Sequence, residues 1–192
     1  MTATSRFSPD QQRQLALLAW QALSHGLCDG PPPAVGGAAW LQEPAATFVT
    51  LTLHGELRGC IGNLRPTSGL GASVARNAEH AAFADPRFGP LQRHELPALR
   101  VEISVLTPMV ALQVPDRAAL LQALRPGVDG LWVQAAGRAA TYLPAVWDDV
   151  PQAAAFVDSL WRKAGLPLLA WPPDIALWTY QADKFAAPDS GR

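Results

Sequence analysis

The chain has 192 residues, of which 49% are hydrophobic, and a formal net charge of −1. This length suits one domain or two small interlocked halves, and the apolar share is enough for a sizeable core. The near-neutral charge, without a long run of one sign, argues against nucleic-acid or acidic-membrane binding driven by bulk electrostatics. No stretch of about 18 apolar residues occurs, so we expect no membrane span.

The two cysteines cannot form a disulfide framework. We expect no signal peptide before Arg6, and therefore a cytoplasmic protein with reduced thiols. Cys28 falls in a loop rich in proline and glycine, and we interpret it as a bystander thiol.

The first predicted helix begins at Ser8 and ends near Gly26. Ser8 is its expected N-cap, Pro9 takes the first helical position, and Gln11 closes a capping box. The residues outside the periodic segments, 1–7 and 186–192, are expected to be flexible tails.

A hairpin follows a long irregular connection. Residues 48–53 alternate β-branched and aromatic residues and predict a strand, His54-Gly55-Glu56 predicts the turn, and residues 57–61 predict the returning strand. A helix capped by Thr67 or Ser68 then runs to about residue 84.

Asp85-Pro86 ends that helix, because the residue before a proline disfavours the α region. Asp85 and Arg87 then lie close enough in a turn to pair with each other or to bracket a ligand. The clearest strand is residues 99–106, in which Glu102 and Ser104 face away from the alternate apolar positions.

The second half of the chain repeats the mixture of helices and hairpins. Its predicted elements are a helix at 115–124, a hairpin of 131–135 and 139–143, a helix from Pro151 to Gly165, and a final strand at 175–180. Short hairpin turns indicate antiparallel pairing, so the predicted class is α+β, a largely antiparallel sheet with packed helices. The order of the elements suggests two similar, intertwined halves.

The most informative stretch is the hexapeptide LRGCIG, Leu57–Gly62. Alternation in a strand puts Arg58, Cys60 and Gly62 on one surface and Leu57, Gly59 and Ile61 on the other. A guanidinium beside a thiol favours the thiolate, which is the nucleophilic form. Gly59 and Gly62 leave room for a ligand, or another backbone, to approach closely.

Metal ligation and classical nucleotide binding are not indicated. The chain has no C-x-x-C, no H-E-x-x-H, no phosphate-binding P-loop and no strand-linked G-x-G-x-x-G. We expect no metal and no cofactor.

Several segments together resemble the AMMECR domain family and, more narrowly, the bacterial stand-alone component A of the AmmeMemoRadiSam system. The matching segments, in the order of the family, are 48–51, 57–62, 81–88, 102–107 and 142–144 with 163–166. The resemblance covers residues 8–185 and implies a single AMMECR-type domain, with a larger and a smaller lobe as a further option. The resemblance implies a fold and a site, but no established reaction.

Two functions remain open. In the first, the protein is an enzyme: Cys60 is the nucleophile or a covalent anchor, Arg58 favours its thiolate and holds a small anionic substrate, and Glu102 moves a proton. The residues that complete the proposed site are Gly59, Gly62, Asp85, Arg87 and Thr141. Arg58 has an alternative role as a partner of Asp85, Glu102 or Glu95 inside the fold.

In the second, the protein is a non-catalytic binding or accessory module. The resemblance implies a pathway shared with a radical SAM protein and a Memo-like protein, and the chain would then hold a substrate or dock these partners.

Overall fold

The computed structural model describes residues 5–28, 30–168 and 171–187. Helices and antiparallel strands alternate along the chain, so the α+β prediction is confirmed. The chain divides into two compact units, residues 1–106 with 183–192 and residues 107–182. The last strand therefore returns to the first unit.

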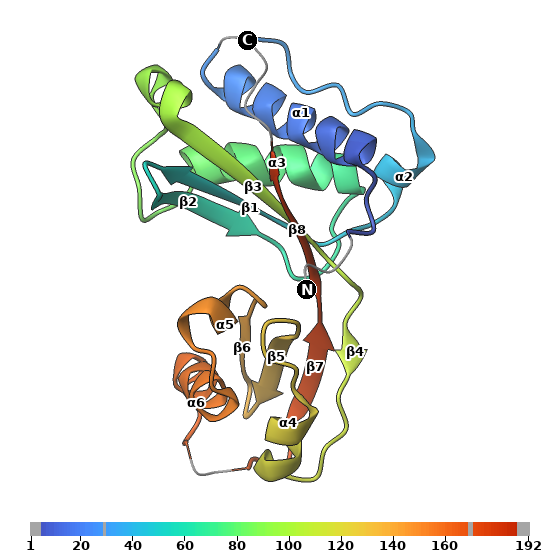
Figure 1. Ribbon diagram of the computed structural model, residues 1–192, viewed down its shortest axis with the longest axis vertical. Helices are drawn as coiled ribbons and strands as arrows, with labels where there is room; N and C mark the ends of the chain where they lie inside the picture. The colour runs from blue at the N-terminus through green and yellow to red at the C-terminus, as the bar shows by residue number, and fades with distance from the viewer. Residues whose placement is uncertain (1–4, 29, 169–170, 188–192) are drawn as a thin grey trace. The chain divides into compact units, whose positions relative to one another are not determined.

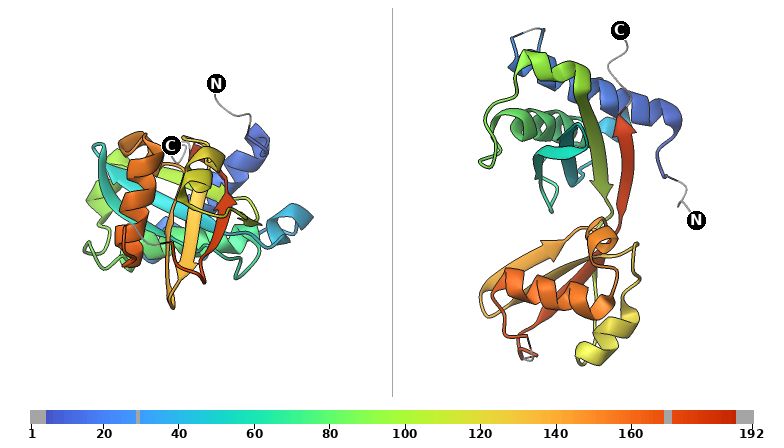
Figure 2. Two further views of the ribbon diagram at one scale, coloured as in Figure 1. Left: turned by 90° about the horizontal axis from the view of Figure 1, so that it is seen from below. Right: turned by 60° about the vertical axis from the view of Figure 1, so that its left-hand side comes forward.

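The first unit is built on a four-stranded sheet in the order β2-β1-β3-β8 (Figure 1). Its strands are β1 (Thr47–Leu53), β2 (Glu56–Gly62), β3 (Leu99–Leu106) and β8 (Ala182–Ala187). Figure 2 shows β8 running beside β3. Its helices are α1 (Pro9–Gly26), α2 (Ala39–Gln42), α3 (Leu70–Phe83) and the 3-10 helix η1 (Arg93–Ala98).

Helices α1 and α3 pack against each other and onto the sheet. Alternate strand residues such as Val49, Leu51 and Ile103 are fully buried against them. Burial of this apolar surface, at roughly 25 cal/mol per Å², is what holds the layers together.

The capping box of α1 is confirmed, because Ser8 and Gln11 exchange side-chain to backbone hydrogen bonds. The predicted caps of α3 are wrong, since Gly69 is its N-cap and has no side-chain bond. A neighbouring segment supplies the missing partners instead: Gly69 forms a β-bridge with Pro44, and the N–H of Leu70 donates to the carbonyl of Glu43.

The second unit contains a second four-stranded sheet in the order β4-β7-β5-β6. Its elements are β4 (Val110–Ala111), α4 (Arg117–Ala123), β5 (Gly130–Ala135), β6 (Arg138–Tyr142), α5 (Val146–Asp149), α6 (Ala153–Ala164) and β7 (Ala176–Tyr180). The predicted hairpin through Gly137 and the stop at Gly165, which has φ 70°, are both confirmed. No helix in the described part of the chain is long and apolar enough to cross a membrane.

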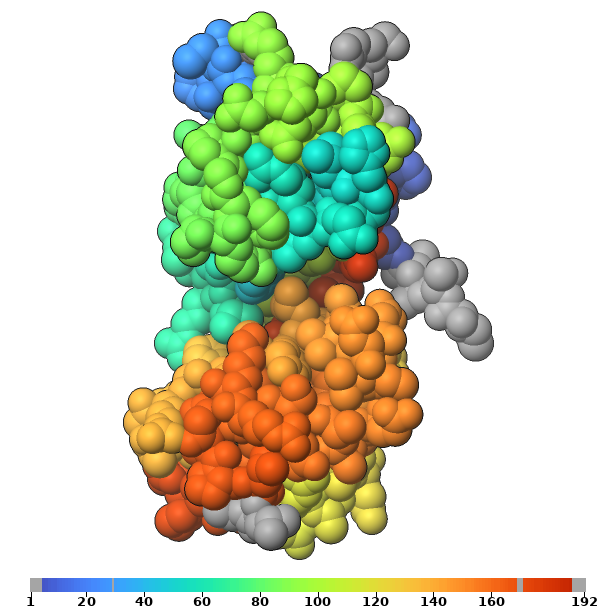
Figure 3. Space-filling model, turned by 90° about the vertical axis from the view of Figure 1, so that its left-hand side faces the viewer, coloured from blue at the N-terminus to red at the C-terminus, as the bar shows by residue number. Residues whose placement is uncertain are grey.

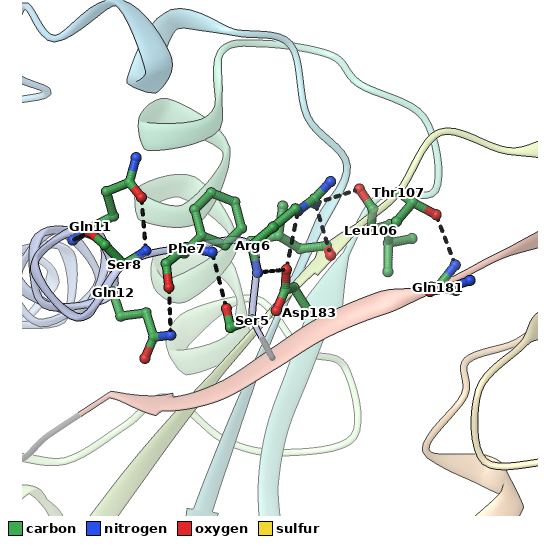
Figure 4. A network of polar contacts seen from close by, with 11 residues as sticks. Ser5, Arg6, Phe7, Ser8, Gln11, Gln12, Leu106, Thr107, Gln181 and Asp183 are labelled. Atoms are coloured by element: carbon green, nitrogen blue, oxygen red, sulfur yellow. Dashed lines mark hydrogen bonds and ion pairs between the residues drawn. The ribbon is translucent and has the colours of Figure 1, made fainter. Parts of the chain in front are cut away.

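Residues 5–7, expected to lie in a flexible tail, make defined contacts in the first unit. Arg6 donates its backbone N–H to the Asp183 carboxylate at 2.9 Å and its guanidinium to the carbonyls of Val105 and Leu106 (Figure 4). The ring of Phe7 lies 6.2 Å from that of Phe185. At the other end, residues 186 and 187 belong to β8, and 1–4 and 188–192 lie outside the described residues.

Candidate functional site

The hairpin that carries the hexapeptide turns at His54 and Gly55, which both have positive φ, 54° and 89°. This is the signature of the tight turns whose twist matches that of the flanking strands. Near the turn Thr52 pairs with Leu57, but further along Leu51 pairs with Gly59. One extra residue, Arg58, is therefore accommodated in a β-bulge.

The bulge corrects part of the predicted alternation. Gly59 and Ile61 pair with Leu51 and Val49, whose buried side chains face α3. Cys60 pairs with Thr50 on the opposite face, as predicted. Leu57 does not join Gly59, because the bulge shifts its pairing to Thr52 and so moves it to the face of Cys60.

Arg58 does not act on Cys60 in the way the sequence suggested, because its side chain turns to the sheet edge. Its Nε lies 2.7 Å from Glu95 Oε1, and its two Nη atoms donate to the carbonyls of Gly89 and Pro90. Of the three carboxylates considered as partners, Glu95 is thus the one it binds. The pKa of Glu95 is lowered, first by this hydrogen bond, and that of Arg58 is raised by it.

Asp85 and Arg87 close the edge of β2 at Cys60. Asp85 Oδ2 accepts the backbone N–H of Cys60 at 2.9 Å, and Arg87 Nη2 donates to the Cys60 carbonyl at 3.3 Å. Both backbone groups of Cys60 therefore point away from β1 and are bonded by the turn that follows α3. In Figure 3 the cyan atoms of the hairpin and the green atoms of the following segment lie side by side.

The predicted proximity of Asp85 and Arg87 is confirmed as an ion pair, with Arg87 Nη2 2.7 Å from Asp85 Oδ2. The Asp85 side chain is only 2% exposed, against 53% for Arg87. The pKa of Asp85 lies far below its ordinary value, chiefly because Arg87 donates to it and also because the backbone N–H of Cys60 does, although burial opposes the shift.

Cys60 is half-buried, and the Thr50 hydroxyl donates to its Sγ at 3.4 Å. Thr50 also pairs with Glu102 on its other side. We call the sheet surface that carries Cys60, Thr50 and Glu102 the thiol face. The Glu102 carboxylate lies 3.1 Å from the ammonium of Lys184 on β8, so Lys184 extends this row to a fourth strand. Cys60 and Glu102 stand two strands apart, about 9–10 Å between Cα atoms.

The space beside Gly59 and Gly62 is filled by other residues of the fold. A Cβ on Gly59 would lie 2.0 Å from the carbonyl oxygen of Ala81 in α3, and one on Gly62 would lie 2.2 Å from the Phe48 ring. Of the two predicted reasons for these glycines, close approach of another backbone is the one the geometry shows for Gly59.

Thr141 lies in the second unit. Its hydroxyl is 2.9 Å from the carbonyl of Leu131 and 2.5 Å from the hydroxyl of Tyr180. Burial raises the pKa of Tyr180 to about 12. Through these bonds Thr141 contributes to the packing of the sheet of the second unit.

Within the described residues, no group of three or more histidine, cysteine, aspartate or glutamate side chains is arranged to hold a metal ion. Sequence reasoning missed Thr50 and Lys184. Thr50 could have been predicted as the cross-strand neighbour of Cys60 if a bulge in the hairpin had been considered. Lys184 lies on a strand that was not predicted.

The molecule is thus an α+β protein in which a half-buried thiol lies on one face of an antiparallel sheet, with its backbone held by an Asp-Arg pair. The chain belongs to the AMMECR1 family, whose model matches residues 16–185.

Relatives and a solved structure agree with this assignment. A protein of Methanothermobacter thermautotrophicus is 39% identical over 150 residues, which cover 75% of this chain and 76% of that protein. Protein TK0174 of Thermococcus kodakarensis is 35% identical over 166 residues, covering 81% and 78%. The crystal structure of Uncharacterized Protein PH0010 from Pyrococcus horikoshii matches with a TM-score of 0.84 at 29% identity, covering 94% of this chain and 93% of that one. These relatives are archaeal, so the narrower resemblance to the bacterial component A stays a prediction.

Proposed function

We propose that this protein is a cysteine-dependent enzyme that acts on a small anionic substrate, with Cys60 as the nucleophile. The observation that carries the proposal is the setting of the thiol: it is half-buried, it accepts a hydrogen bond from Thr50, and its backbone is held on both sides by Asp85 and Arg87. The Thr50 hydroxyl, which donates to Sγ at 3.4 Å, holds the sulfur in place for attack on a bound substrate.

Arg87 takes the electrostatic role first considered for Arg58. Its guanidinium bonds to the Cys60 carbonyl and is half exposed, whereas that of Arg58 is held by Glu95 and two carbonyls. The pKa of Arg87 is raised, chiefly by its hydrogen bond to Asp85. In the proposal Arg87 attracts the anionic group of the substrate towards the thiol.

Glu102 is the proposed acid/base group, but not for the thiol itself. A general base has to lie within hydrogen-bond reach of its proton, or be joined to it through one water. About two strand spacings separate Glu102 from Cys60, so Glu102 would serve a substrate group bound over Thr50. Lys184, paired with Glu102 at 3.1 Å, holds the carboxylate in position on this face.

Two small alkylating reagents test the proposal, because iodoacetate is anionic and iodoacetamide is neutral. We expect the ratio of their rates at Cys60, measured in a Cys28→Ser variant, to exceed the ratio at the exposed Cys28, measured in a Cys60→Ser variant. Arg87→Met should lower the ratio at Cys60, whereas Arg58→Met, the matched control, should leave it unchanged. Equal ratios at the two cysteines would contradict the proposed preference for an anion.

A specific observation favours a second candidate, a non-catalytic binding or accessory module. Asp85, bonded to the backbone of Cys60, and Glu95, bonded to Arg58, are both ion-paired and have lowered pKa values, so neither takes up a proton at neutral pH. The partners would be the radical SAM and Memo-like proteins that the resemblance to component A implies. Co-purification with either partner would favour this candidate, and no association at micromolar concentration would count against a stable complex.

A further inference from the structure

The pairing of β1 with β2 changes register inside the hexapeptide. On the turn side Leu53 pairs with Glu56 and Thr52 with Leu57, whereas beyond the bulge Leu51 pairs with Gly59. The hairpin turn and the hexapeptide are therefore in two different registers, and Arg58 is the residue that separates them.

This change decides which way the thiol faces. If the register of the turn continued along the strand, Cys60 would lie opposite Val49, whose side chain is 0% exposed and faces α3. A shift by one residue moves a side chain to the other face of a sheet. The observed register instead pairs Cys60 with Thr50, on the thiol face.

Helix α3 contacts the hexapeptide at Gly59. A Cβ there would lie 2.0 Å from the carbonyl oxygen of Ala81, which is backbone and cannot move aside as a flexible side chain can. In the register of the turn, Arg58 would take the place of Gly59 opposite Leu51, and its side chain would meet the helix.

Helix α3 makes a second contact where the hexapeptide ends. Asn77 Nδ2 lies 2.8 Å from Asn63 Oδ1, 2.8 Å from Thr47 Oγ1 and 3.0 Å from the Thr47 carbonyl, which also accepts the backbone N–H of Asn63 at 3.0 Å. Ser73 of α3 bonds to both Thr47 and Asn63. Asn77 is 3% exposed. These side chains tie the first residue of β1 to the residue after Gly62.

We infer that helix α3, through Asn77 and the glycine contact at Ala81, sets the register that puts the Cys60 thiol on the thiol face, and that the hairpin turn does not. Asn77 is then a positioning residue of the site, since it acts on Cys60 through Asn63 and Thr47. The inference rests on the proposed function only for the chemistry of the Cys60 thiol. The face of the sheet on which the thiol lies can be measured independently of that chemistry.

A cross-strand disulfide reports the register. In a Cys28→Ser background, Thr50→Cys puts a second thiol opposite Cys60 in the observed register, and Val49→Cys does so in the shifted one. Because the backbone groups of Cys60 point away from β1, the Thr50 pair is of the closely spaced kind, with Cα atoms about 4.5 Å apart. We expect copper–phenanthroline oxidation to cross-link the Thr50→Cys protein and not the Val49→Cys protein.

Asn77→Leu should lower the ratio of Thr50→Cys to Val49→Cys cross-linking about tenfold, which is what loss of one buried hydrogen-bond partner corresponds to. Gly59→Ala should act in the same direction. Val74→Ala, on the same helix and also buried, is the control for a general loss of stability and should leave the ratio unchanged. Gly55→Ala, which strains the turn at φ 89°, should leave it unchanged as well.

If Asn77→Leu does not fold, Ser73→Ala replaces it, with a smaller shift in the same direction. Two results would overturn the inference. One is a ratio of Thr50→Cys to Val49→Cys cross-linking that stays unchanged in the helix-contact variants and in Gly59→Ala. The other is a large fall of this ratio in Gly55→Ala. Either result leaves the proposed function standing, because the alkylation ratios at Cys60 are measured separately on the unaltered strand.

Discussion

The carboxylate of Asp85 accepts the backbone N–H of Cys60 at 2.9 Å, so a side chain takes the position that a neighbouring strand would hold. Arg87 completes the arrangement by donating to the carbonyl of the same residue. Edge strands are exposed to wrong pairing unless they are covered. The turn after α3 therefore covers the edge of β2 and, with the same two residues, fixes the backbone of Cys60.

Asp85→Asn should lower the free energy of unfolding by about 2–3 kcal/mol, because the bonds to Arg87 and Cys60 lose the negative charge and one of the two accepting oxygens becomes an NH2 donor. Urea denaturation measures the change. Asp10→Asn is the matched control, since Asp10 pairs with Arg13 at the surface with 81% of its side chain exposed, and exposed pairs contribute little. Equal stability of the Asp85 and Asp10 variants would show that the edge contact does not stabilise the fold.

Acid should destabilise the protein through Asp85 and Glu95. Both carboxyl groups have pKa values below their ordinary range in the folded state, so their stabilisation is present above the unfolded pKa of about 4 and is lost as the pH falls towards the folded values. Urea midpoints between about pH 6 and pH 2 should fall with acidification. In the Asp85→Asn/Glu95→Gln double variant the fall should be shallower, and an identical profile would refute this assignment.

Thr50→Val should slow the alkylation of Cys60, because the hydroxyl that donates to Sγ at 3.4 Å is removed while the volume of the side chain is kept. The expected loss is about threefold to tenfold, which corresponds to one hydrogen bond. Thr52→Val, on the same strand and face but opposite Leu57, is the control. If both variants react at the wild-type rate, the Thr50 hydroxyl has no part in the reaction of the thiol.

Arg6→Ala should loosen the end of β8. The backbone of Arg6 remains able to bond to Asp183, but the guanidinium contacts with Asp183, Val105 and Leu106 are lost. We expect faster amide hydrogen exchange in 183–187 and at the end of β3, with Arg13→Ala as a surface control. Exchange protection equal to that of the unaltered protein would show that the Arg6 side chain does not hold this strand.

Periodicity and turn chemistry predicted most of the elements, because they depend on neighbours in the sequence. The capping box at Ser8, the hairpins through Gly55 and Gly137, and the stop at Gly165 are all local signals. The bulge at Arg58 was not predictable in this way, since strict alternation assumes one register along a strand. It arises from contacts with α3, which follows the hexapeptide in the chain.

In the candidate site, too, contacts between sequence neighbours could be predicted, whereas contacts between distant residues could not. Asp85 and Arg87 pair because only two residues separate them, whereas the partner of Arg58, Glu95, lies in the 3-10 helix η1, 37 residues along the chain. Lys184 was missed because Ala182–Ala187 has no β-branched residue, and such a segment becomes a strand only where a neighbour such as β3 pairs with it.

Whether Cys60 is a reactive nucleophile is measured by the rate of its alkylation with iodoacetamide as a function of pH, in a Cys28→Ser background, for the folded and the urea-unfolded protein. We expect the folded protein to react at a rate comparable with that of the unfolded one, because the thiol is only half-buried and its backbone is held in place by Asp85 and Arg87. A thiol that reacts only after unfolding would rule out a nucleophilic Cys60, because Cys60 would then be a packing residue.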